Sequence, residues 1–229
     1  MQAEILHHPN WAQTALGTPI ELYQKIHTSG RPILFVGGIH GDEPEGVRLA
    51  QDFLAWLQNT PDKIVHNWLL IPDINPDGSS RKQRTNSNGV DLNRNFPSPD
   101  WSSEAKAPRY NPGPSPGSEL EIQALIQLIQ KHNPKLIVHF HSWEPCVVYT
   151  GASAKVASEI IGKGTTYPVR EDIGYPTPGS LGQYGWYTLH TPVICVEAQD
   201  HSPLDTIWPI FMRGLKSLMQ TPDLGLKND

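Results

Sequence analysis

The sequence predicts an α/β fold in which helices cover both faces of a mixed, largely parallel central sheet. Short apolar runs typical of buried strands alternate along the chain with segments of helical periodicity. Turn-forming residues separate these segments, and neither an internal repeat nor a linker divides them. The length of 229 residues suits one hydrophobic core, so we expect residues 1–229 to form a single domain.

The clearest elements begin after residue 30, and before it the only candidate is an edge strand over 19–23. The apolar run 33–36 predicts a buried strand, and residues 44–58 predict an amphipathic helix with apolar side chains at helical spacing. Residues 75–78 have the composition of a turn. Further strands are expected over 67–72, 136–140, 145–150 and 191–196, and further helices over 118–131, 152–162 and 203–219.

Composition excludes several classes of protein. Charged residues make up 18% of the chain, which with 22 Pro and 19 Gly indicates a loop-rich globular protein. The net charge of -5 favours neither nucleic acid nor an anionic membrane as a partner. No apolar run reaches the roughly 18 residues of a membrane span, and the first eight residues lack an export signal. We therefore expect a cytoplasmic protein, and the oligomeric state stays open.

The two cysteines and the long polar segment 79–117 are the next features of note. Cys146 and Cys195 lie in apolar stretches, so we expect reduced thiols packed in the core. A polar segment of this length inside a compact domain is usually functional. We expect its second half, residues 98–117, to shape the entrance of a site.

His40 and Glu43 form the best candidate for a metal clamp. They follow the expected strand 33–36 and the flexible pair Gly37-Gly38, and Pro44 suits the first position of a helix. Both residues therefore lie in a strand-to-helix loop, where open α/β sheets bind their ligands. The spacing alone is a weak signal in a chain with ten His and 23 acidic residues.

His141 and Glu197 strengthen this interpretation because each also follows an apolar strand. Parallel strands would bring all four side chains to one edge of the sheet. His40, Glu43 and His141 would then hold one zinc ion with an open fourth position for water, and Glu197 would take the proton of that water. His139 competes with His141, because residues two apart in a strand point the same way. We favour His141, at the end of the strand.

The chain resembles the zinc carboxypeptidase family related to carboxypeptidase A over about residues 31–200. The resemblance rests on motifs at 38–43, 75–78, 84–96 and 141–142 and on Glu197, of which Gly-Val-Asp-Leu-Asn-Arg-Asn-Phe is the most specific. Within the family, the segments 116–119 and 175–180 are most similar to the short bacterial murein peptide amidases. The resemblance implies the carboxypeptidase fold, one zinc ion and a peptide substrate.

The resemblance also implies roles for residues outside the metal clamp. Arg84 would polarise the scissile carbonyl and stabilise the oxyanion, a task that suits a fixed guanidinium. Asn93 and Arg94 would bind the terminal carboxylate of the substrate, and Tyr175 would be the mobile tyrosine of the family. A position near Leu181 would line the pocket for the released residue. Arg84 could instead belong to a solvated basic face. Asn93 and Arg94 could merely brace their loop, without a role in substrate binding.

These roles predict a metallopeptidase that hydrolyses an amide bond beside a free carboxyl end. The murein amidase resemblance implies the bond between γ-D-glutamate and meso-diaminopimelate in murein peptides, and a role in peptidoglycan recycling. One alternative is an N-acyl amino acid deacylase resembling aspartoacylase or succinylglutamate desuccinylase. Another is a binding module that keeps the fold without catalysis.

Overall fold

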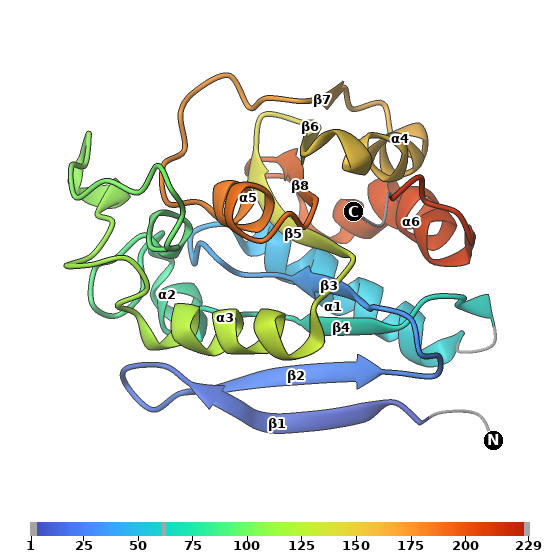
Figure 1. Ribbon diagram of the computed structural model, residues 1–229, viewed down its shortest axis with the longest axis horizontal. Coiled ribbons are helices and arrows are strands. Elements are labelled where there is room, and N and C mark those ends of the chain that lie inside the picture. Colours follow the sequence, from blue (N-terminus) through green and yellow to red (C-terminus); the bar gives the residue numbers. More distant parts are fainter. Residues whose placement is uncertain (1–3, 61–62, 227–229) are drawn as a thin grey trace.

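The computed structural model describes residues 4–60 and 63–226 and contains an eight-stranded sheet of order β1-β2-β4-β3-β5-β8-β6-β7 (Figure 1). β4, β3, β5 and β8 are parallel neighbours, whereas β1, β2 and β6 join by antiparallel pairing. The predicted mixed, largely parallel sheet is therefore confirmed. Its strands are β1 (Leu6–Gln13), β2 (Pro19–Lys25), β3 (Ile33–Val36), β4 (Trp68–Ile71), β5 (Leu136–Trp143), β6 (Cys146–Thr150), β7 (Val169–Arg170) and β8 (Val193–Gln199).

The helices agree with the predicted ones apart from a few short elements. They are α1 (Pro44–Asn59), α2 (Pro76–Arg81), α3 (Leu120–His132), α4 (Lys155–Lys163), α5 (Leu181–Gln183) and α6 (Leu204–Gln220). Two expectations were wrong. β2 is not an edge strand, because β1 pairs with its outer side. The turn expected at 75–78 begins helix α2, because the Asn75 side chain accepts a hydrogen bond from the Gly78 amide and caps the helix.

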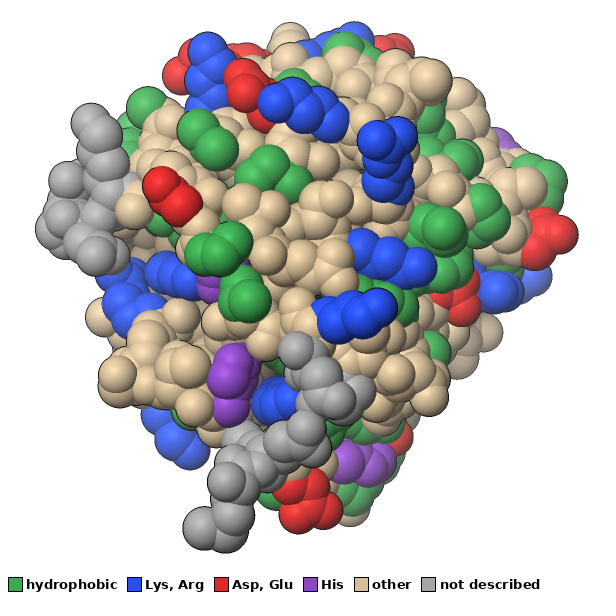
Figure 2. Space-filling model, turned by 90° about the vertical axis from the view of Figure 1, so that its right-hand side faces the viewer, with side chains coloured by type: hydrophobic (Ala, Val, Ile, Leu, Met, Phe, Trp, Pro, Cys, Tyr) green, Lys and Arg blue, Asp and Glu red, His purple; other side chains and the backbone are tan. Residues whose placement is uncertain are grey.

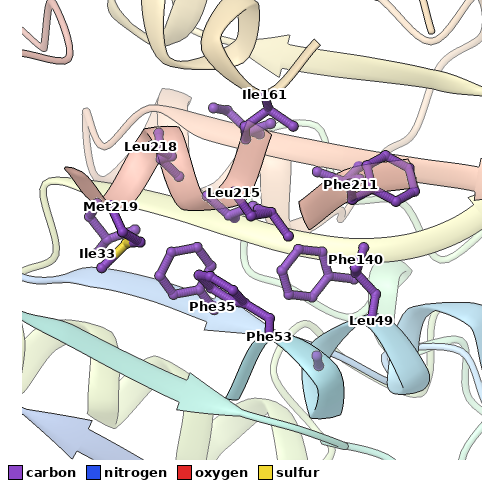
Figure 3. Close-up of a cluster of buried hydrophobic side chains, with 14 of the residues drawn as sticks. Ile33, Phe35, Leu49, Phe53, Phe140, Ile161, Phe211, Leu215, Leu218 and Met219 are labelled. Atoms are coloured by element: carbon purple, nitrogen blue, oxygen red, sulfur yellow. The ribbon is translucent and has the colours of Figure 1, made fainter. Parts of the chain in front are cut away.

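One face of the sheet packs against α1, α4 and α6. Figure 3 shows part of this core, where Phe35 and Phe140 of the sheet meet Phe53 of α1 and Leu215 of α6. The Phe35 and Phe53 rings contact edge to face at 4.8 Å. β3 and β4 are buried on both faces of the sheet, which explains why they carry continuous hydrophobic runs rather than alternating ones.

The opposite face of the sheet packs against α3 and α5 and carries the polar residues. Val138 and Phe140 belong to the core beneath α1 and α6, whereas Ile137 belongs to the core beneath α3 and α5. Side chains alternate along a strand, so His139 and His141 share the face of Ile137. Both histidines therefore lie on the α3 and α5 side of the sheet, at the carboxyl end of β5.

The loops at the carboxyl ends of the strands gather at the left of Figure 1. They include the long segment that follows α2 and the segment that joins β7 to α5. Figure 2 shows the opposite side of the molecule, where charged side chains of both signs are scattered and hydrophobic ones form separate small groups. Within the described ranges, none of the helices has the length and apolar character to cross a membrane.

Helix α1 lies unusually close to β5, and Gly46 makes this possible. A Cβ atom at Gly46 would stand 2.5 Å from the carbonyl oxygen of Phe140, which is backbone and cannot rotate away. Because Glu43 caps the amino end of α1 and His141 follows Phe140, this contact also sets the distance between those two candidate ligands.

We expect Gly46→Ala to lower the free energy of unfolding by about 1–3 kcal/mol, since overpacking forces the backbones apart. Urea unfolding measures the change, with Gln51→Ala on the exposed face of α1 as control. Equal stability of Gly46→Ala and wild-type protein would contradict the close packing of α1 on β5.

Candidate active site

His40 and Glu43 meet in the loop between β3 and α1. After Val36 the chain turns through Gly38, whose φ of +66° lies in the left-handed region and where a Cβ atom would collide with the Asp73 carboxylate. The turn brings Nδ1 of His40 to 2.7 Å from Oε1 of Glu43. The loop between β3 and α1 therefore brings two of the three predicted metal-binding residues together by itself.

β5 supplies the third member of the clamp. Nδ1 of His141 lies 2.7 Å from Oε2 of Glu43 and 3.0 Å from Nδ1 of His40. The side chains of both histidines are almost fully buried, with exposed fractions of 3% and 2%. The two nitrogens and the carboxylate oxygens thus converge on one point between β3, α1 and β5.

The outer nitrogens of the two imidazoles have partners of their own. Nε2 of His40 lies 3.1 Å from Oδ1 of Asp91. Burial opposes ionisation of Asp91, but His40 and Arg84 outweigh it and hold the pKa of this carboxyl far below its usual value. Asp91 therefore accepts, and His40 carries its proton on Nε2. In the same tautomer, His141 donates from Nε2 to Nδ1 of His139, 2.8 Å away.

This arrangement fits a zinc ion. With their protons on Nε2, both histidines present unprotonated Nδ1 atoms to each other and to the Glu43 carboxylate, so acceptors converge without a donor between them. A cation at this point would satisfy all of these acceptors at once. Ligands about 2.1 Å from a tetrahedral zinc lie about 3.4 Å from one another, which needs only a small adjustment here. His139 does not reach the point where these ligand atoms converge, which agrees with the choice of His141 as the third ligand.

Arg84 braces the clamp from the polar segment. Its Nε donates to Oδ2 of Asp91 at 2.8 Å, and its Nη1 donates to Oε1 of Glu43 at 3.2 Å. Burial opposes its charge, but Asp91 and Glu43 outweigh it and raise the pKa of the guanidinium. The side chain is only 13% exposed, so Arg84 does not belong to a solvated basic face.

Glu197 lies beside His141, because β5 and β8 align these two residues in register. It belongs to β8 itself rather than to the loop after it. Cys195 donates a hydrogen bond from Sγ to its Oε1 at 3.1 Å, while the buried Oε2 has no partner in the part of the chain that the structure describes. Burial raises the pKa of Glu197, and the Glu43 charge adds to this shift. A buried carboxylate with a free oxygen can accept a proton.

Asn93 and Arg94 lie on a 3₁₀ turn (Leu92–Arg94) that Asp91 caps. Oδ1 of Asn93 accepts from the Leu181 amide at 2.9 Å, and Nη1 of Arg94 donates to the Asn93 carbonyl at 2.7 Å. Arg94 is 8% exposed, and no carboxylate among the described residues pairs with it. A buried guanidinium that no carboxylate contacts directly can bind an anion.

Tyr175 lies farther out, on the segment between β7 and α5. Its ring is 42% exposed and contacts Trp143 edge to face at 5.4 Å. Burial and then the Glu197 charge raise the pKa of its hydroxyl to about 12, so the phenol stays protonated at neutral pH. It can therefore donate a hydrogen bond to a group in the site.

All eight predicted site residues line one cavity of about 750 Å³. They are His40, Glu43, Arg84, Asn93, Arg94, His141, Tyr175 and Glu197. Asp42, Trp143, Gly182 and Gln183 are further members of the wall. Leu181 itself is fully buried and does not line the cavity, whereas its neighbours Ser180 and Gly182 do, so a pocket position near Leu181 stays a prediction.

The segment 98–117 contributes Arg109 and Tyr110 to the same cavity, as expected for a segment at its entrance. The guanidiniums of Arg84, Arg94 and Arg109 lie 5.2, 5.8 and 5.5 Å from the centre of the Tyr110 ring. This contact could not be predicted from the sequence, because Tyr110 lies in a stretch without periodicity. Cys195 was also missed, although it stands two positions before Glu197, the spacing that places two side chains on one face of a strand.

Comparisons with known proteins agree with this geometry. Residues 5–176 match the family described as zinc carboxypeptidase. Murein peptide amidase A of Escherichia coli is 33% identical over 186 residues, which cover 76% of this chain and 74% of that protein. The corresponding protein of Vibrio campbellii is 28% identical over 94% of this chain and 88% of its own length.

Solved structures show the same relationship. The crystal structure of murein-tripeptide amidase from Escherichia coli O157 superposes with a TM-score of 0.79 and 29% identity, covering 93% of this chain and 91% of that one. Bovine thrombin-activatable fibrinolysis inhibitor, at 20% identity, shares the fold with a TM-score of 0.77, covering all of this chain and 92% of that one. The chain belongs to the zinc carboxypeptidase family.

Proposed function

We propose that this protein is a zinc-dependent peptidase that cleaves the amide bond between γ-D-glutamate and meso-diaminopimelate in murein peptides. The observation that carries the proposal is one cavity in which three converging acceptors, a carboxylate with a free oxygen and an unpaired guanidinium lie together. These are the parts needed to hold a metal, move a proton and bind a free carboxyl end. The relatives named murein peptide amidase supply the substrate class.

His40, Glu43 and His141 would hold the zinc ion through the two Nδ1 atoms and the carboxylate. When bound, zinc supplies Lewis acidity, which polarises a carbonyl and acidifies water. Asp91 and His139 accept hydrogen bonds from the outer nitrogens of the two imidazoles and so keep both rings turned toward the metal.

Glu197 would accept the proton of the attacking water on Oε2 and then pass it to the amine that leaves. The raised pKa of this carboxyl brings it closer to neutral pH, which favours both transfers. Arg84 would donate to the oxyanion of the tetrahedral intermediate. Its Nε and Nη1 are fixed by Asp91 and Glu43, so the guanidinium needs no reorganisation during the reaction.

Arg94 and Asn93 would bind the free carboxylate of diaminopimelate. The Arg94 guanidinium donates to the Asn93 carbonyl and forms no ion pair within the described residues, so a substrate carboxylate could pair with it directly. Tyr175, on its exposed segment, would donate from its hydroxyl to the substrate. We further propose that residues 1–229 act as one catalytic domain, supported by the fact that all described strands join one sheet. Cytoplasmic location and a role in peptidoglycan recycling stay predictions.

The function is tested by mass spectrometry of the products formed from L-Ala-γ-D-Glu-meso-diaminopimelate by the zinc-loaded protein. We expect release of meso-diaminopimelate and L-Ala-γ-D-Glu. Removal of the metal with a chelator should abolish the reaction, and zinc should restore it. A hippuryl dipeptide panel and N-acetyl and N-succinyl amino acids serve as alternative substrates.

Each alternative outcome has a defined meaning. Cleavage of ordinary dipeptides without the murein tripeptide would keep the carboxypeptidase chemistry and reject the murein substrate. Cleavage of N-acyl amino acids alone would identify a deacylase. A zinc-loaded protein that binds peptides without cleaving any would identify a binding module.

Replacing Glu197 by Gln keeps the shape of the side chain but removes the proton acceptor. We expect kcat to fall by about 10²–10⁴-fold, the usual contribution of a general base, while the bound zinc remains at one ion per chain. Steady-state kinetics and metal analysis measure the two quantities. Glu104→Gln, at an exposed position in the segment 98–117, is the matched control and should retain full activity. Retained activity in Glu197→Gln would remove Glu197 as the base.

Replacing His139 by Leu removes the acceptor for Nε2 of His141. We expect the zinc affinity to fall by about 10–100-fold, because partners of this kind orient metal-binding imidazoles. Competition with a fluorescent chelator measures the dissociation constant. His139→Asn retains an acceptor and should lose less affinity. Equal affinities in wild-type protein and His139→Leu would show that His139 only fills space.

A further inference from the structure

Cys195 occupies a position on the cavity wall that its sequence context does not indicate. In β8 it alternates with the core residues Ile194 and Val196, so it shares the face of Glu197. The parallel register aligns it with His139, as Glu197 is aligned with His141. It is one of the residues that line the cavity, and its thiol is free. The expected packing in the core applies to Cys146 but not to Cys195.

The thiol of Cys195 contacts the carboxylate that the proposed reaction depends on. Its Sγ lies 3.1 Å from Oε1 of Glu197, within the range of a sulfur hydrogen bond. Burial, and after it the Glu197 charge, raises the pKa of this thiol well above its usual value. The sulfur therefore keeps its proton at neutral pH and acts as the donor, which makes it a poor nucleophile.

The second oxygen of the same carboxylate provides an independent observation. Glu197 is 5% exposed, and its Oε2 is buried without a hydrogen-bond partner anywhere in the described ranges. Leaving a buried carboxylate oxygen unpaired is costly, and a catalytic role or a bound ligand is one explanation for such an atom. The terminal torsion of Glu is broad, so without a contact at Oε1 the carboxylate plane could turn and direct neither oxygen at the reacting water.

We propose that Cys195 is a positioning residue, whose thiol holds Oε1 of Glu197 so that Oε2 remains directed at the reacting water. The inference rests on the proposed function, because it assigns Cys195 a part in the proton transfer by Glu197. It also accounts for a carboxylate and a thiol in a strand where Val193, Ile194, Val196 and Ala198 are apolar and buried.

The test compares two substitutions at this position with a control in the neighbouring strand. Cys195→Ala removes the donor, and we expect kcat on the murein tripeptide to fall about tenfold with KM unchanged, since a weak hydrogen bond to a charged group is lost. Cys195→Ser retains a donor and should recover most of the loss. Cys146 lies opposite Glu197 in the neighbouring strand, but its buried thiol forms no hydrogen bond with Glu197 in the described part of the chain. Cys146→Ala should therefore leave kcat unchanged.

A spectroscopic measurement separates this role from simple packing. The S–H stretching band of Cys195, assigned by its loss in Cys195→Ser, should shift to higher frequency in Glu197→Ala, whereas the band of Cys146 should not move. An unshifted Cys195 band, or equal kcat values in wild-type protein and Cys195→Ala, would overturn the inference. So would a Cys195→Ser variant as slow as Cys195→Ala, because that result indicates packing alone.

Zinc content distinguishes positioning from metal binding. The ligand atoms of His139, His141 and Cys195 also lie within 4.8 Å of one another. We expect Cys195→Ala to keep the zinc stoichiometry of the wild-type protein, and loss of a zinc ion would assign the thiol to a metal site instead. A wild-type protein that cleaves no substrate would refute the proposed function, but the infrared shift would still test the contact between Cys195 and Glu197.

Discussion

The site depends on the approach of two imidazole Nδ1 atoms to 3.0 Å around one carboxylate. Neutral acceptors at this distance repel one another, and the protein keeps them together by fixing each ring from outside. Asp91 holds His40, His139 holds His141, and the loop before α1 holds Glu43 between them. The approach requires β3 beside β5 and α1 pressed against β5, so much of the fold serves this contact. A cation at the centre would convert the repulsion into binding.

Asp91 is the centre of the hydrogen-bond network in the polar segment after α2. Asp91 accepts from His40 and Arg84 through its side chain and caps the 3₁₀ turn that carries Asn93 and Arg94. One buried carboxylate thus connects a candidate metal ligand to two candidate substrate-binding residues. A segment with this many buried polar contacts cannot follow a helical or strand pattern, because its hydrogen bonds go to side chains rather than to a regular backbone ladder.

The sequence allowed the parallel core and its main helices to be predicted, because continuous apolar runs and helical periodicity act locally. It also allowed the clamp to be predicted, because His40, Glu43, His141 and Glu197 all accompany such runs. The edge strand β1 escaped prediction since most of it is exposed and it has no apolar run. Helix α2 was mistaken for a turn because the Asn75 cap uses the same residues as turns do. The pairing of Tyr110 with three arginines is long-range and leaves no local signal.

Strand periodicity accounts for the way the site is supported. β5 and β8 run in parallel and in register, so His141 stands beside Glu197, and His139 stands beside Cys195 two residues earlier. His141 donates a hydrogen bond to His139, and Glu197 accepts one from Cys195, so each of the two is held by the residue two positions before it on its own strand. Side chains two residues apart lie on the same face of a strand. His139 and Cys195 therefore lie beside His141 and Glu197, although apolar residues flank them in the sequence. A His-x-His strand beside a Cys-x-Glu strand is one unit, in which the first member of each pair orients the second.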